Sequence, residues 1–228
     1  MFSSVEDLST PPVLRAGRHN IPRDEVVRIQ RGRVLDAVAD VVSVSGYANL
    51  SVEGIISTAG ISRRTFYDLF SDKEDAFLQA YDRASTAIEA AVAHTFEQAE
   101  GPVQQAIVCM SVLARALSAE PTLTEMYIVE VLGAGPDALA RRDQVMRAMA
   151  ALIERAVADL PRERLPPPTT PETIIGGIFE VIHSRTLRGE LDELPALVPD
   201  FVYTLTMPYL GPAGALEAYE AAKRYVPD

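Results

Sequence analysis

The sequence has a single cysteine, Cys109, among 228 residues. One cysteine cannot form a disulfide within the chain, and it excludes metal sites that need several cysteines. No run approaches 18 uninterrupted apolar residues, so no membrane-spanning helix is predicted. The first ten residues, MFSSVEDLST, lack the basic and apolar regions of a secretory signal. We therefore expect a cytoplasmic protein without a membrane partner.

Positive charge is also scarce, since 21 Lys and Arg face 32 Asp and Glu, a net charge of −11. On average this disfavours a nucleic-acid partner. The deficit is uneven: residues 1–75 carry −2 and residues 76–228 carry −9, whereas residues 15–33 hold six arginines against two acids. That stretch is either a solvated arm and helix face, or an arm that contacts phosphates within about one Debye length, roughly 8 Å.

Strand patterns are rare, and almost every long segment has apolar residues at helical spacing. Residues 1–22 are rich in proline and polar residues, which predicts a flexible N-terminal arm. The sequence thus predicts an all-α protein with a small three-helix head and a larger helical body. The expected helices cover residues 24–45, 52–58, 63–69, 73–99, 103–119, 122–132, 137–159, 171–188 and 195–207, with a short one in the tail near 213–224.

The segment SVEGIISTAGISRRTFYDLF, residues 51–70, has the pattern of a helix-turn-helix. Gly60 suits the tight turn because it tolerates a positive φ. Phe66 and Phe70 can anchor the second helix, which leaves polar side chains outward. Arginine suits guanine edges and phosphates, and hydroxyls suit phosphates. The alternative is an ordinary helical hairpin whose exposed face happens to be polar.

The run GISRRTFYDLFSDKEDAFLQAYD resembles the DNA-binding domain of the TetR family of bacterial transcriptional regulators. The resemblance covers about residues 28–82. It implies a DNA-binding head over residues 23–75 and a ligand-binding and dimerisation body over residues 76–228. By position, the implied DNA-binding residues are Ser51, Ser62, Arg63, Arg64, Thr65, Tyr67 and Lys73.

The body is rich in soft apolar side chains, which are either ordinary core or the lining of a pocket for a small, largely apolar ligand. The candidate ligand-binding residues are Met110, Met126, Tyr127, Glu130, Phe179 and His183. Glu180 and His183 have the spacing used in di-iron bundles, but no second such motif occurs. We therefore predict no metal and no cofactor.

Two apolar helices, residues 171–188 and 195–207, are either the monomer's own core or a dimer interface. A homodimer would supply two half-sites on a palindromic double-stranded operator. The sequence thus predicts a DNA-binding regulator, most simply a repressor released by an unknown small-molecule effector. The alternative is an all-α enzyme or small-molecule carrier without a DNA role, but no catalytic constellation is visible, so an enzyme is not predicted.

Overall fold

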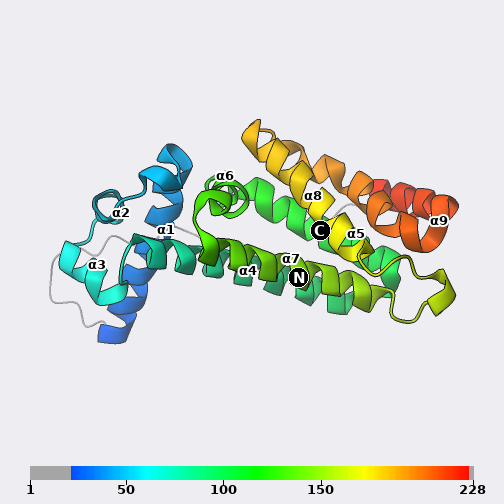
Figure 1. The fold of residues 1–228 in the computed structure, drawn as a ribbon, viewed down its shortest axis with the longest axis horizontal. Helices are drawn as coiled ribbons and strands as arrows, with labels where there is room; N and C mark the ends of the chain where they lie inside the picture. Colours follow the sequence, from blue (N-terminus) through cyan, green and yellow to red (C-terminus); the bar gives the residue numbers. More distant parts are fainter. Residues whose placement is uncertain (1–21, 226–228) are drawn as a thin grey trace.

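The computed structural model describes residues 22–225, and the described chain is built from helices without a strand (Figure 1). The all-α class is therefore confirmed. Three helices form a head at one end, and α4 leads from the head along an elongated body (Figure 1). The expected arm lies outside the described residues, except for Pro22. In chain order the helices are α1 (Arg23–Ser45), α2 (Val52–Ala59), α3 (Arg63–Leu69), α4 (Lys73–Gln98), α5 (Gly101–Ala119), α6 (Pro121–Thr124), α7 (Pro136–Ala156), α8 (Thr170–Leu187) and α9 (Val198–Arg224).

The core of the head forms on one stripe of α1. Val34, Val38 and Val42 are buried on that stripe and pack beneath α2 and α4. Gly46 then ends the helix with a positive φ of 76°, and its N–H donates to the Val42 carbonyl at 2.8 Å. The chain turns through a short 3₁₀ segment, Tyr47–Asn49, into α2.

The body is a bundle in which α5 occupies a central place, packed against α4 and α9. By length and composition alone α5 is apolar enough to cross a membrane. Its buried side chains, among them Ile107, Leu113 and Leu117, instead face the neighbouring helices of the bundle. The apolar character of α5 is thus explained by its packing.

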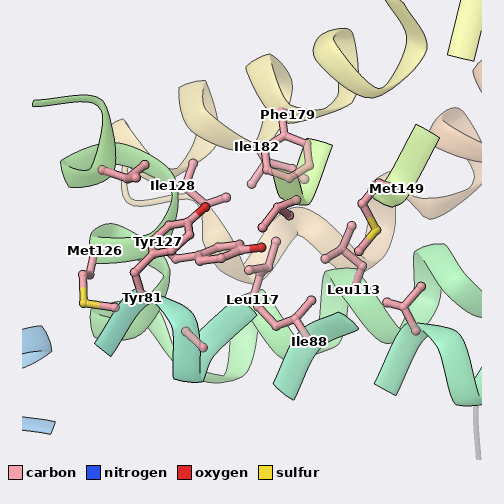
Figure 2. Close-up of a cluster of buried hydrophobic side chains, with 14 of the residues drawn as sticks. Tyr81, Ile88, Leu113, Leu117, Met126, Tyr127, Ile128, Met149, Phe179 and Ile182 are labelled. Carbon is pink, nitrogen blue, oxygen red and sulfur yellow. The ribbon is translucent and has the colours of Figure 1, made fainter. Parts of the chain in front are cut away.

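One predicted helix, residues 122–132, is three shorter elements in the structure. After α6 come a π-helical turn, Glu125–Val129, and a 3₁₀ turn, Glu130–Gly133. The change of winding places Tyr127 against Tyr81 of α4, with stacked rings 5.0 Å apart (Figure 2). Tertiary packing thus replaces the uniform helix that the local pattern favours.

The helix expected over residues 195–207 also differs. Its first part belongs to a 3₁₀ segment, Leu191–Leu197, and α9 begins one residue before Pro199. Proline is accepted there because the first turn of a helix has no partner for its N–H. α9 then continues into the tail helix, with a bend at Gly211, where φ is +71°.

Candidate nucleic-acid interface and effector cavity

α2 begins at a side-chain cap and ends at a left-handed glycine. The hydroxyl oxygen of Ser51 accepts a hydrogen bond from the Gly54 N–H at 3.1 Å, so the exposed hydroxyl proton remains able to donate to an anion. Gly60 has φ +60° and ψ 45°. A Cβ on Gly60 would lie 2.7 Å from a guanidinium nitrogen of Arg33. The turn between α2 and α3 therefore requires glycine.

α3 is held by a cap at its start and by two aromatic rings on one side. The Ser62 hydroxyl accepts from the Thr65 N–H at 3.0 Å, and the two hydroxyl oxygens lie 2.9 Å apart. Phe66 and Phe70 are buried with ring centroids 5.6 Å apart. These contacts fix the orientation of α3, so its opposite face is presented to solvent in a defined way.

The exposed face of α3 carries the two adjacent arginines and a tyrosine. Arg63 donates to Glu53 at 2.6 Å, and Arg64 lies 4.0 Å from Asp68. Both pairs are largely exposed, and such pairs contribute only about 0–1 kcal/mol. A phosphate can therefore replace the carboxylates. Tyr67 is 51% exposed, so its hydroxyl is accessible as well.

Lys73, at the start of α4, is engaged inside the molecule. Its ammonium group donates to the Leu50 carbonyl at 2.7 Å and lies 5.6 Å from the centre of the Tyr47 ring. The same ring meets Phe77 edge-on at 4.8 Å. Lys73 thus joins α4 to the connection between α1 and α2, whereas the sequence predicts a phosphate contact for it.

Two of the arginines in residues 15–33 also pack onto the head. Arg31 donates to Gln79 and lies 5.0 Å from the centre of the Phe70 ring. Arg33 donates to the Gly60 carbonyl at 3.4 Å. These two side chains support the head, so they contribute little to a phosphate-contacting arm. Arg15 and Arg18 lie outside the described residues.

The body contains a cavity with an empty volume of about 670 Å³, counting the open space at its mouth. Helices α4, α5, α7, α8 and α9 all contribute to its lining, which is almost wholly apolar. The lining includes Val92, Phe96, Met110, Met149, Ile175 and Leu205.

A family model described as bacterial regulatory proteins, tetR family, matches residues 34–80, from the middle of α1 through α3 into α4. This segment is thus similar to the TetR family of bacterial regulatory proteins. Over 135 residues the chain is 27% identical to the HTH-type transcriptional repressor KstR of Mycobacterium tuberculosis, a match that covers 59% of the chain and 61% of the relative. The KstR of Mycolicibacterium smegmatis is also 27% identical over 135 residues, 66% of its length. The chain thus spans less than two thirds of these relatives.

Several solved structures share the fold of this chain. The fatty acid degradation regulator FadR from Bacillus halodurans superposes with a TM-score of 0.68 at 18% identity, covering 76% of this chain and 96% of that one. FadR from Bacillus subtilis, solved in complex with stearoyl-CoA, has a TM-score of 0.68 at 16% identity over 79% and 98% of the two chains. At 16–18% identity, the similarity to these two structures extends to the fold alone.

The sequence-predicted effector residues fall in different parts of the helical body. Met110 lines the cavity. Met126, Tyr127 and Phe179 belong instead to a packed cluster of buried side chains (Figure 2). Soft apolar side chains fill cores and line cavities equally well, so their type alone does not separate the two positions.

The two polar candidates lie near the head. Glu130 accepts a hydrogen bond from the Tyr47 N–H at 2.6 Å, which joins the body to the turn after α1. His183 is half-buried on α8, near Glu125. Burial raises the pKa of the Glu125 carboxyl, the charge of Glu130 adds to this, and His183 opposes it. Within residues 22–225, no three His, Cys, Asp or Glu side chains gather in a metal-binding arrangement.

Gln105 and Tyr209 line the cavity but were not among the sequence-predicted residues. Gln105 could have been suspected from the sequence, because it is a polar side chain on a largely apolar helix. Tyr209 had no such indication, because α9 extends beyond the helix that the sequence pattern predicts.

Proposed function

We propose that this chain is a DNA-binding transcriptional repressor that a small, largely apolar molecule releases from its operator. The observation that carries the proposal is the exposed polar face of α3, with Arg63, Arg64 and Tyr67 on a helix fixed by the Ser62 cap and the Phe66 anchor. Arginine and tyrosine side chains of this kind contact base edges and phosphates. The similarity to the KstR repressors supports the same function.

In this proposal residues 23–75 bind DNA, residues 76–228 bind the effector and the second subunit, and residues 1–22 are an arm. The proposed DNA contacts come from Ser51, Ser62, Arg63, Arg64, Thr65 and Tyr67, with Lys73 adding positive charge at the N-terminus of α4. The protein acts in the cytoplasm, where its operator is.

The proposed active form is a homodimer, because two heads are needed to bind two half-sites about one helical turn apart. Support comes from α8 and α9, which leave several large apolar side chains exposed. These are Val181, Leu187, Tyr203 and Met207. A two-fold interface through these helices would bury them.

Effector control is proposed to act through α4, because this helix contributes Val92 and Phe96 to the cavity and Lys73 to the head. A ligand shifts an equilibrium only by its differential affinity for the two states. The effector must therefore bind more tightly to the form whose heads do not fit the operator. The FadR structure with stearoyl-CoA supports a lipid-derived effector for a body of this fold.

The test begins with enrichment of binding sites from a random duplex library, followed by titration of the enriched duplex at several salt concentrations. Arg63→Ala is expected to weaken operator binding by about 1–3 kcal/mol, and Tyr67→Phe to weaken it by about 1 kcal/mol. Arg147→Ala, which removes an exposed arginine of α7 paired with Asp143, is the matched control. Unchanged operator affinity in both head variants would refute the site assignment.

A small-molecule carrier without a DNA role is the second candidate, and the cavity favours it. The two candidates differ in the salt experiment, because phosphate contacts make log K fall linearly with log salt concentration. A carrier would enrich no duplex and would show no such slope.

A further inference from the structure

We infer that the effector cavity selects an uncharged, lipid-like molecule with a single hydrogen-bonding group, and that it rejects the carboxylate of the same chain length. This inference rests on the proposed function, since it names the class of molecule that the effector site takes. It is argued from the lining of the cavity, the hydrogen bonds already made there and the charges beside it.

The lining offers no charged side chain to a ligand. All eighteen residues that form it are apolar except Gln105, Cys109, Thr206 and Tyr209, and none of them is Lys, Arg, His, Asp or Glu. An ionised group transferred into such surroundings loses its hydration without gaining a counter-charge. The hydrocarbon part of a ligand, in contrast, gains stability from every apolar area that it buries.

Three of the four polar side chains already have partners in the protein. The Cys109 thiol points to the Val92 carbonyl at 3.7 Å, and the Thr206 hydroxyl donates to the Val202 carbonyl at 2.8 Å. The Gln105 amide nitrogen lies 3.4 Å from the Ala99 carbonyl. These bonds use the Thr206 and Cys109 protons, whereas Gln105 keeps its carbonyl oxygen and a second N–H for a neutral polar atom.

The Tyr209 hydroxyl makes no side-chain hydrogen bond to residues 22–225, and its oxygen is not fully enclosed by protein. Tyr209 is 9% exposed and faces the same cavity. A neutral phenol can donate to one oxygen of a ligand or accept from one hydroxyl. One alcohol or carbonyl group at this end of the ligand would satisfy it.

The charges beside the cavity also disfavour an anion. Burial raises the pKa of the Tyr209 hydroxyl, and the negative charge of Glu154 raises it further, so the surroundings of this hydroxyl favour its uncharged form. Arg155 lies 4.8 Å from the centre of the Phe96 ring, but its guanidinium is paired with Glu97. A ligand carboxylate inside the cavity would therefore find no cation among the lining side chains.

The test compares 1-dodecanol, dodecanoate and dodecanoyl-CoA, which share one chain and differ in charge. Each is titrated at pH 8 against the full chain loaded with Nile red, an uncharged fluorescent probe, and loss of probe fluorescence reports binding. We expect dodecanol to bind at least about tenfold more tightly than either anion, the equivalent of about 1.4 kcal/mol. Equal or tighter binding of dodecanoate or dodecanoyl-CoA, or no displacement by dodecanol, would overturn the inference.

A variant pair tests the missing counter-charge directly. Gln105→Lys adds a cation to the partly buried lining, and we expect it to tighten dodecanoate binding about tenfold or more while leaving dodecanol binding nearly unchanged. Gln104→Lys adds the same charge to an exposed position of α5 that does not line the cavity. An equal gain in both variants would attribute the effect to overall charge and refute a selection made by the lining.

Tyr209→Phe tests the single hydrogen bond. Removing one hydroxyl is expected to weaken dodecanol binding about three- to tenfold and to leave Nile red binding unchanged. Equal dodecanol affinity in the variant and the parent would remove Tyr209 from the inference.

None of these titrations contains DNA, so the two proposals can fail separately. If the chain enriches no operator but prefers dodecanol, the proposed repressor function is refuted and the inferred ligand selectivity of the cavity stands. If the chain binds an operator but prefers dodecanoate, the proposed repressor function stands and the inferred preference for an uncharged ligand is refuted.

Discussion

At the scale of single residues, Gly60 shows how one backbone conformation supports the turn before α3. Its φ of +60° is unfavourable for a residue with a Cβ, and an added Cβ would also displace the Arg33 guanidinium. We expect Gly60→Ala to lower the free energy of unfolding by about 1–2 kcal/mol, measured by urea denaturation. Gly32→Ala is the control, because Gly32 lies within α1 with no neighbour that a Cβ would meet, and it should raise stability by about 0.5–1 kcal/mol. Equal effects of the two substitutions would contradict the conformational argument.

Cys109 illustrates the chemical effect of burial on one side chain. Burial raises the pKa of its thiol to about 12, so the reactive thiolate is almost absent at neutral pH. At pH 8 we expect labelling by Ellman's reagent to be at least about 100-fold slower in the folded chain than in urea, and to quicken about tenfold per pH unit below the pKa. Labelling of the folded chain at the rate of the unfolded one would show that the thiol is accessible and ionised.

At the scale of elements, the short turns after α6 connect the body to the head. Glu130 accepts the Tyr47 N–H at 2.6 Å, and its carboxylate lies within 3.5 Å of the place where a Gly46 side chain would begin. Glu130→Ala removes the acceptor, so we expect the Tyr47 amide to exchange its hydrogen at least about tenfold faster, in line with a loss of roughly 1–3 kcal/mol for a bond to a charged group. Glu130→Gln keeps an acceptor oxygen and should stay near the parent rate. Unchanged exchange in the alanine variant would exclude the contact in solution.

The elements of the head could be predicted closely from the sequence, because their ends are decided by neighbouring residues. Ser62 caps α3, and the predicted range 63–69 agrees with the observed helix. Gly60 likewise ends α2 within one residue of the prediction. The turns after α6 depend instead on packing between distant segments, such as the Tyr81–Tyr127 stack, and no local pattern encodes them.

At the scale of the whole molecule, the exposed apolar side chains of α8 and α9 bear on assembly. If these helices form the dimer interface, Met207→Glu would bury a charge there without a partner. We expect this variant to be a monomer by light scattering at concentrations where the parent is a dimer. Val44→Glu is the control, since Val44 is 89% exposed on the head. Dimers that persist in Met207→Glu would exclude this part of α9 from the interface.

The face of α3 could be predicted from the sequence, whereas most of the cavity lining could not. The residues of the α3 face lie within five positions, from Arg63 to Tyr67, so a short motif contains them all. The cavity draws on five helices, and positions as distant as Val92 and Tyr209 meet there. Met110 was the member of the predicted set on its wall, while Met126 and Phe179 fill the packed cluster, because only the relative placement of the helices distinguishes these positions.

α4 extends without a break from Lys73, beside the recognition head, to Val92 and Phe96 on the cavity wall. Nineteen residues separate Lys73 from Val92, which corresponds to about 28 Å of helix at 1.5 Å per residue. The exposed face of α3 and the cavity wall therefore share no side chain, so either can be changed by substitution while the other is kept. If the proposed function holds, redesign of the cavity wall would yield a genetic sensor for a new compound that still binds the original operator.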